Sequence, residues 1–239
     1  KPHLLLQSKK HIFIISHMRA RTTLLSHILN TSNEIVGSNE LHVRYRNAFD
    51  ELKARTMRIH DHGFYESSYI CDKLLHNRLE INLDRYRNAK YIFNLRPVED
   101  TFKSLLLRHL QHQPASSVHK LQEYYTKRLI YMKELWEALP PENRIYINSD
   151  DVIDDTQKSL IKLQEFLSLL EPLSEEYSID KNTGTSGHGD MSTNITEGKV
   201  IKTAPSLLTE NEEKLLNQIC TKSEFELFDE LEALFNTGV

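Results

Sequence analysis

Short apolar runs alternate with longer amphipathic segments along the chain, and this alternation constrains the fold more than any other feature of the sequence. Residues 11–15 read HIFII, a run rich in β-branched side chains that is typical of a buried strand. Residues 22–30 follow with leucine and isoleucine side chains on one helical face. Repetition of this unit favours a mainly parallel sheet flanked by helices, so we predict an α/β fold. Further strands are predicted at residues 34–37, 69–71, 91–95 and 144–147, and further helices at 41–60, 98–112, 117–139, 156–170 and 211–235.

The chain is predicted to form one domain over residues 1–239, because its length suits one domain and no linker-like tract divides it. Its net charge of −4 argues against broad binding to nucleic acid. No run reaches the roughly 18 apolar residues of a membrane-spanning helix, and no signal peptide is legible. Two cysteines are too few for a disulfide framework, which favours a reducing, cytoplasmic location.

The loop after the first predicted strand carries the strongest chemical signal. Arg19 and Arg21 stand directly before Thr22 and Thr23, where the next helix is predicted to begin. Free backbone N–H groups, the helix dipole, guanidinium groups and hydroxyls would all converge on a bound anion there. The simpler alternative is a threonine cap beside two solvated arginines. A nucleotide-kinase P-loop is disfavoured, since the loop lacks the two glycines and the lysine of that motif.

The sequence of this loop, RARTTLL at residues 19–25, resembles the phosphosulfate loop of sulfotransferases that use 3′-phosphoadenosine 5′-phosphosulfate (PAPS). In that family the loop reads approximately RSGTTLL, so Arg21 stands where most members have glycine. The resemblance implies a sulfotransferase of bacterial type with features of the protein-tyrosine sulfotransferases, and a P-loop-like fold. It also implies that residues Arg19, Ala20, Arg21, Thr22 and Thr23 bind the co-substrate.

A second motif resembles the 3′-phosphate site of the same family. Arg96 ends the strand predicted at residues 91–95, and Ser104 lies eight residues further on, in the next helix. Arg108 follows one turn later, so that Ser104 and Arg108 share a helix face. Each residue alone could be an ordinary surface residue. Two motifs in the family's order make coincidence a poor explanation, and we predict that all three residues bind the nucleotide.

Three weaker matches extend the resemblance. Glu40 stands where relatives place a catalytic glutamate, and Lys73 matches a lysine that helps to bind the transferred group. Lys202 lies in a late segment, residues 198–203, that resembles one folding over the nucleotide. Asn148 departs from the family, because relatives have tyrosine there.

These residues suggest a mechanism for sulfuryl transfer. Arg19 and Lys73 would stabilise the developing charge, and Glu40 would take the proton of the acceptor hydroxyl. His42 is the rival base. We predict a helix from residue 41, on which Glu40 and His42 would leave different faces, so that only one points inward. The protein's own cations would make a metal unnecessary, and the histidines at positions 60, 62, 109 and 112 are better explained as solvated than as metal ligands.

The sequence therefore predicts a PAPS-dependent sulfotransferase that leaves 3′-phosphoadenosine 5′-phosphate (PAP) as product. The alternatives are a non-catalytic module that binds PAPS or PAP, suggested by Arg21 and Asn148, and a magnesium-dependent phosphotransferase. The acceptor stays open among carbohydrate, lipid-linked sugar, polyketide chain and small alcohol. The variable regions 113–117 and 171–197 are the predicted places for acceptor binding, and the oligomeric state is left open.

Overall fold

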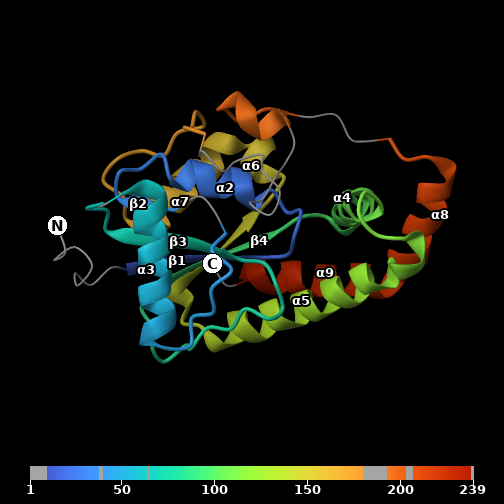
Figure 1. The fold of residues 1–239 in the computed structure, drawn as a ribbon, viewed down its shortest axis with the longest axis horizontal. Coiled ribbons are helices and arrows are strands. Elements are labelled where there is room, and N and C mark those ends of the chain that lie inside the picture. The colour runs from blue at the N-terminus through green and yellow to red at the C-terminus, as the bar shows by residue number, and fades with distance from the viewer. Residues whose placement is uncertain (1–9, 38–39, 64, 180–192, 203–206, 238–239) are drawn as a thin grey trace.

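A parallel β-sheet forms the centre of the computed structural model, which describes residues 10–37, 40–63, 65–179, 193–202 and 207–237 (Figure 1). Within these residues the sheet has five strands in the order β2-β3-β1-β4-β5, and every pairing is parallel. Parallel neighbours need crossover connections, and helices supply them. The predicted α/β class with a mainly parallel sheet is confirmed. The strands are β1 (Lys10–Ser16), β2 (Ile35–Val36), β3 (Tyr69–Leu74), β4 (Lys90–Leu95) and β5 (Arg144–Asn148).

Helices cover both faces of the sheet, because alternate side chains of each strand point to opposite sides. Ile12 and Ile14 of β1 pack in one core, whereas Phe13 and Ile15 pack in the other. Figure 1 shows α2, α6 and α7 on one face of the sheet and α5 and α9 on the other. The first three helices pack in the core of Ile12 and Ile14, and the other two pack in the core of Phe13 and Ile15. The helices are α2 (Thr22–Leu29), α3 (Ala48–His62), α4 (Val98–Leu110), α5 (His119–Ala138), α6 (Asp151–Asp154), α7 (Thr156–Leu167), α8 (Glu210–Ile219) and α9 (Lys222–Thr237), with 3₁₀ turns η1 (Ala115–Ser117), η2 (Pro141–Asn143) and η3 (Thr193–Glu197).

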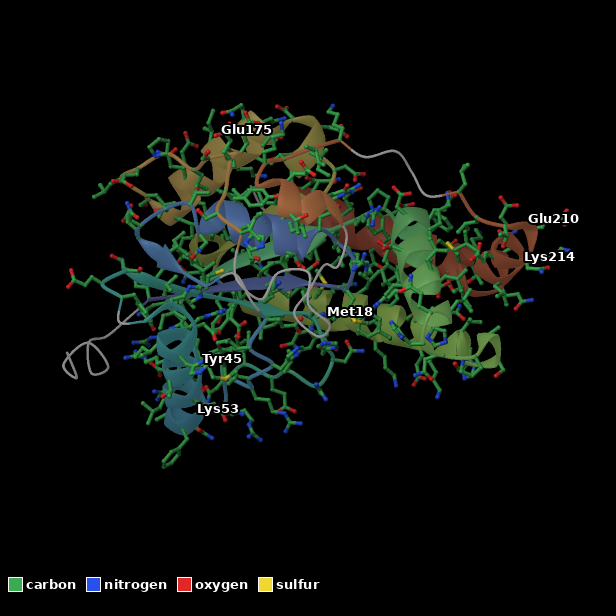
Figure 2. All side chains as sticks on the ribbon, turned by 45° about the horizontal axis from the view of Figure 1, so that its top comes forward. Met18, Tyr45, Lys53, Glu175, Glu210 and Lys214 are labelled. Atoms are coloured by element: carbon green, nitrogen blue, oxygen red, sulfur yellow. The ribbon has the colours of Figure 1, made fainter. Side chains whose placement is uncertain are left out.

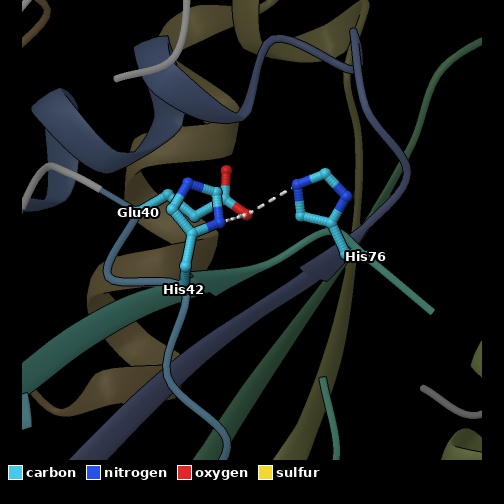
Figure 3. A group of neighbouring side chains, drawn as sticks. All are labelled: Glu40, His42 and His76. Atoms are coloured by element: carbon cyan, nitrogen blue, oxygen red, sulfur yellow. Dashed lines mark ion pairs between the residues drawn. The ribbon is translucent and has the colours of Figure 1, made fainter. Parts of the chain in front are cut away.

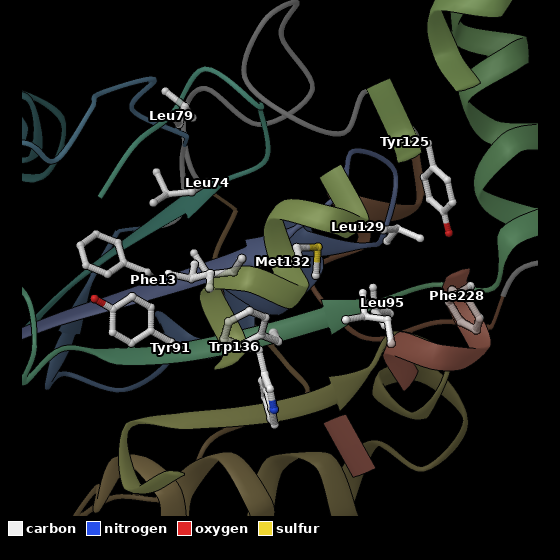
Figure 4. Packing of buried hydrophobic residues seen from close by; sticks show 14 of the residues in the cluster. Phe13, Leu74, Leu79, Tyr91, Leu95, Tyr125, Leu129, Met132, Trp136 and Phe228 are labelled. Atoms are coloured by element: carbon white, nitrogen blue, oxygen red, sulfur yellow. The ribbon is translucent and has the colours of Figure 1, made fainter. Parts of the chain in front are cut away.

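The larger core lies between the sheet and the long helix α5. Trp136 of α5 meets Phe93 of β4 edge-on at a ring-centroid distance of 5.0 Å and Phe235 of α9 at 4.3 Å. Figure 4 shows Trp136, Met132 and Leu129 of α5 reaching toward the strands. These contacts hold α5 along the sheet, so that its first turns lie near the carboxyl ends of the strands.

The predicted helix over residues 41–60 is wrong in its first part. Residues 41–46 form no helix, and His42 has a left-handed backbone with φ 53°. Leu41, Val43 and Tyr45 are buried while the residues between them are exposed. The backbone of Tyr45 exchanges hydrogen bonds with Glu80 and Asn82, at 2.8 and 2.9 Å. Helix α3 begins only after Asn47, whose side chain accepts bonds from the first N–H groups of the helix. Glu40 is therefore not at the start of a helix.

The predicted helix over residues 211–235 is two helices. The helical conformation is interrupted after α8, at Cys220 and Thr221. The carboxylate of Glu224 in α9 accepts hydrogen bonds from the N–H and the hydroxyl of Thr221, at 3.0 and 2.6 Å. These bonds satisfy donors at the start of α9. The other predicted helices and strands agree with the structure to within three residues at each end. In the described part of the chain, no helix combines the length and apolar character needed to cross a bilayer.

Candidate functional site

A cavity of about 270 Å³ opens at the carboxyl edge of the sheet, where α/β folds bind their ligands. Met18, labelled in Figure 2, belongs to its wall and marks this edge of the sheet. The cavity brings together residues from the loops after β1, β2, β3 and β4, together with Arg108 of α4. Its lining consists of Met18, Arg19, Arg21, Thr22, Thr23, Glu40, His42, Leu75, His76, Arg96 and Arg108.

The loop after β1 enters α2 through two residues in the left-handed conformation, Arg19 with φ 67° and Arg21 with φ 57°. Left-handed backbone at a residue other than glycine costs roughly 1–2 kcal/mol. Arg21 forms an ion pair with Asp150, just beyond β5, and donates to the Ser149 hydroxyl at 3.2 Å. The charge of Arg21, which stands where the sulfotransferase loop has glycine, is thus paired, and Thr22 and Thr23 at the start of α2 line the cavity.

The two predicted phosphate-binding motifs are joined to each other. Arg96 donates from Nη1 to the backbone carbonyl of Arg19 at 3.0 Å, and Arg19 donates from Nε to the Ser104 hydroxyl at 2.8 Å. Burial, with the positive charges of Arg21 and Arg19 nearby, lowers the pKa of Arg96 to about 10, so Arg96 stays charged at neutral pH. The Nε of Arg96 is buried and makes no hydrogen bond within the described residues. A buried donor on a cation suits an anionic ligand.

Two buried side chains that sequence reasoning did not single out hold these loops in place. His17 is fully buried, donates from Nδ1 to the Met18 carbonyl at 3.0 Å and accepts the Arg96 N–H at 3.3 Å. Burial lowers its pKa to about 4, so His17 is neutral. Arg128 of α5 donates to the Ser16 carbonyl at 2.7 Å and to the Leu74 carbonyl. The only sequence signal for His17 was a histidine directly after a buried strand.

Tyr124 of α5 makes a third link between the loops. Its hydroxyl accepts the Met18 N–H at 2.8 Å and donates to the Leu75 carbonyl at 2.6 Å. The structure shows that it ties the loop after β1 to the loop after β3, which together form much of the cavity wall.

Lys73 lies beneath the cavity rather than in its wall. Its side chain is buried in β3, and Nζ donates to the Thr23 hydroxyl at 3.3 Å. Burial lowers the pKa of Lys73, while the charges of Glu40 and Asp72 act in the opposite direction. Asp72 accepts the Leu41 N–H at 3.0 Å and the Tyr45 hydroxyl at 2.7 Å. Asp72 thereby fixes residues 41–45, the segment that follows Glu40.

Glu40, His42 and His76 form a cluster at one side of the cavity (Figure 3). Glu40 Oε1 lies 3.3 Å from His42 Nδ1 and 3.4 Å from His76 Nε2. Burial raises the pKa of Glu40 to about 7, against the opposing charge of Lys73, and burial lowers that of His76 to about 4. The prediction that only one of Glu40 and His42 points inward is wrong, because the helix on which it rested is absent there and both line the cavity.

His76 was not among the predicted site residues, because the third strand is longer than the sequence pattern suggested. The prediction stopped at residue 71, whereas β3 runs to Leu74, which puts His76 two residues beyond the strand end. A histidine at the carboxyl end of a parallel strand would have been a signal for the site.

The remaining predicted residues lie in different places. Ala20 is buried, and Arg108 lines the cavity with its guanidinium bonded to Gln111 at 3.2 Å. Lys202 lies outside the cavity lining; its side chain is 68% exposed and pairs with Asp154 at 2.9 Å. Asn148 donates to Glu232 of α9 at 3.1 Å. The structure thus groups the predicted residues around one cavity, with Lys202 apart from it.

Comparison with solved structures identifies the class of fold. The structure is similar to mouse sulfotransferase SULT7A1 complexed with PAP, with a TM-score of 0.57 and 14% identity over 97% of this chain and 87% of that one. The sulfotransferase domain from the Synechococcus PCC 7002 olefin synthase gives a TM-score of 0.55 and 16% identity, over 90% of this chain and 97% of that one. A sulfotransferase from Alicyclobacillus acidocaldarius gives a TM-score of 0.55 and 14% identity, over 96% of this chain and 97% of that one.

This chain therefore has the sulfotransferase fold, as the sequence resemblance implied. No protein-family model and no curated protein matches its sequence. The likeness lies in the fold, and the function has to be argued from the site.

Proposed function

We propose that the protein is a sulfotransferase that moves a sulfuryl group from PAPS to an acceptor hydroxyl. The observation that carries the proposal is a single cavity in which two arginine-containing loops lie next to a buried carboxylate. Sulfuryl transfer needs both parts, since an anionic co-substrate must be held and a hydroxyl proton must be removed.

In this proposal the nucleotide lies across the two joined loops. The N–H groups and hydroxyls of Thr22 and Thr23 hold the 5′-phosphate at the start of α2. Arg96, with its unsatisfied Nε, and the nearby Arg108 contact the 3′-phosphate. Ser104 accepts a bond from Arg19 and so keeps that guanidinium in place beside both phosphates.

The transfer step follows from the same arrangement. The acceptor oxygen attacks sulfur, the bond between sulfur and the 5′-phosphate oxygen breaks, and PAP leaves. Glu40 takes the acceptor proton, with His42 as the alternative base in the same wall of the cavity. Arg19 stabilises the charge on the leaving phosphate, and Lys73 supports it from below through Thr23. These cations let transfer proceed without a metal. A small-molecule or glycan acceptor would approach from the side of Glu40.

The test is a transfer assay with sulfur-labelled PAPS and a panel of glycans, lipid-linked sugars and small alcohols, with a chelator present. We expect label in at least one acceptor and PAP as the other product. PAP binding without transfer to any acceptor would instead favour the non-catalytic module. Transfer of a phosphoryl group that requires Mg²⁺ would favour the phosphotransferase.

A further inference from the structure

The cluster of Glu40, His42 and His76 has a geometry that its proposed catalytic role does not require. One donor atom from each side chain lies within 4.8 Å of the other two. Among the described residues, it is the one group of three or more histidine, cysteine or carboxylate side chains with this spacing. Figure 3 shows both imidazole rings directed at the Glu40 carboxylate.

The spacing fits a tetrahedral metal ion. Zinc binds imidazole nitrogen and carboxylate oxygen at about 2.0–2.2 Å, so neighbouring ligand atoms of a tetrahedron lie about 3.3–3.6 Å apart. Glu40 Oε1 is 3.3 Å from His42 Nδ1 and 3.4 Å from His76 Nε2. The third edge of the tetrahedron joins the ring nitrogens of His42 and His76. The His42 side chain is 38% exposed, which leaves it room to rotate and bring its nitrogen to the required distance. Three ligands leave the fourth position open to the cavity.

A second observation points to a cation at the same place. The Glu40 side chain is only 7% exposed, and its Oε1 is buried without a hydrogen-bond partner within the described residues. A buried carboxylate oxygen without a donor destabilises the folded protein. A metal ion between the two histidines would satisfy it.

We propose that Glu40, His42 and His76 bind a divalent transition-metal ion of the zinc type. Two nitrogen ligands and one oxygen ligand favour zinc over magnesium or calcium, which prefer oxygen. The nearby positive charges of Lys73 and Arg128 repel any cation here, so only an ion with strong affinity for imidazole overcomes the repulsion and binds. Metal binding itself does not depend on the proposed function. Its consequence does: a bound ion occupies the carboxylate that takes the acceptor proton and therefore inhibits transfer.

Calorimetric titration of Zn²⁺ into the full chain, carried without a histidine tag, tests the site. We expect one ion per chain and no saturable binding of Mg²⁺. His42→Asn and His76→Asn should each weaken Zn²⁺ binding at least about tenfold, as should the nearly isosteric Glu40→Gln. His60→Asn is the matched control, because the His60 side chain is 83% exposed and lies outside the cluster. Melting temperatures confirm that each variant is folded.

The proposal is overturned if the wild-type chain binds no Zn²⁺ with one-to-one stoichiometry, or if His42→Asn and His76→Asn bind it as the wild type does. A loss with His60→Asn equal to theirs would also overturn it. The transfer assay, repeated with Zn²⁺ and then with chelator, separates the two proposals. If the protein binds Zn²⁺ at these residues but transfers no sulfuryl group, the proposed function is refuted and the metal site stands. If the protein transfers the sulfuryl group, does not bind Zn²⁺ and is not inhibited by it, the metal site is refuted and the proposed function stands.

Discussion

The two sides of the cavity are built in different ways. On the side proposed to bind the nucleotide, three arginines are each bonded to a different part of the chain: Arg19 to α4, Arg21 to the residues just beyond β5, and Arg96 to the loop after β1. On the side proposed to receive the acceptor, Glu40 precedes the segment that Asp72 fixes. Its Oε1 lies within ion-pair distance of His42 and His76 but makes no hydrogen bond within the described residues. The first side is preorganised for an anion, while the second retains an unsatisfied acceptor. We infer that binding belongs to the first side and proton transfer to the second.

The largest expected effect tests the acceptor side. Glu40→Gln keeps size and polarity but cannot take a proton, so turnover should fall about 10²-fold or more while PAP affinity stays within about twofold. Steady-state transfer kinetics and PAP titration measure the two quantities. His42→Asn is the comparison variant, for which we expect a milder loss. Loss of transfer in His42→Asn but not in Glu40→Gln would make histidine the base.

The next prediction concerns how the nucleotide side is held together. His17 is fully buried and its pKa is lowered to about 4, so the unfolded chain, with the usual histidine pKa of about 6.5, binds the proton more tightly. The contribution of neutral His17 to the free energy of unfolding is fully present above pH 6.5 and is lost as the pH falls toward 4. By pH 5 this one group should reduce the free energy of unfolding by about 2 kcal/mol.

Urea unfolding at pH 7.5 and pH 5 checks this prediction, with His17→Gln as the variant and His60→Asn as the control. The pH-dependent loss should be smaller in His17→Gln and unchanged in His60→Asn. His11, which burial also keeps neutral with a pKa near 4, contributes a similar loss that remains in both variants. An identical loss in the wild type and His17→Gln would contradict the role assigned to His17.

A third prediction tests the 3′-phosphate assignment on the nucleotide side. PAP should bind at least about tenfold more tightly than adenosine 5′-phosphate, because charge-assisted contacts to the 3′-phosphate contribute roughly 1.5–3 kcal/mol. Arg96→Ala should remove most of that difference. Comparing both nucleotides in both proteins cancels any general damage to the loop, since Arg96 also supports the Arg19 carbonyl. Equal affinity of the wild type for the two nucleotides would refute the assignment.

The smallest expected effect concerns Arg21. Replacing it with glycine relieves the left-handed backbone but removes the partly exposed ion pair with Asp150, so stability should change by less than about 1 kcal/mol. Arg21→Ala loses the pair and keeps the strain, so it should be about 1 kcal/mol less stable than Arg21→Gly. Thermal unfolding measures the difference. Equal stability of the two variants would show that position 21 carries no backbone strain.

Local pattern was enough to predict the strand, loop and helix from residue 11 to residue 29, and with it the loop of Arg19 to Thr23. These residues are consecutive, and the apolar period and the chemistry of the loop can both be seen in one short window. The same holds for Arg96 and Ser104, because a strand end and the following helix are neighbours in sequence. The class of fold followed from repetition of that unit.

The tertiary structure alone decided the acceptor side of the cavity. Residues 41–46 are not helical because Tyr45 bonds to Glu80 and Asn82 and Leu41 bonds to Asp72, partners more than thirty positions away. The same long-range contacts bring Glu40 and His42 next to His76. The alternation of Leu41, Val43 and Tyr45 with polar residues is a period of two that the sequence itself shows. The charged residues that follow have a helical period, and the distant partners select where one gives way to the other. His17 and Tyr124 likewise acquire their roles from distant partners, Arg96 just beyond β4 for His17, and Met18 and Leu75 in the loops after β1 and β3 for Tyr124.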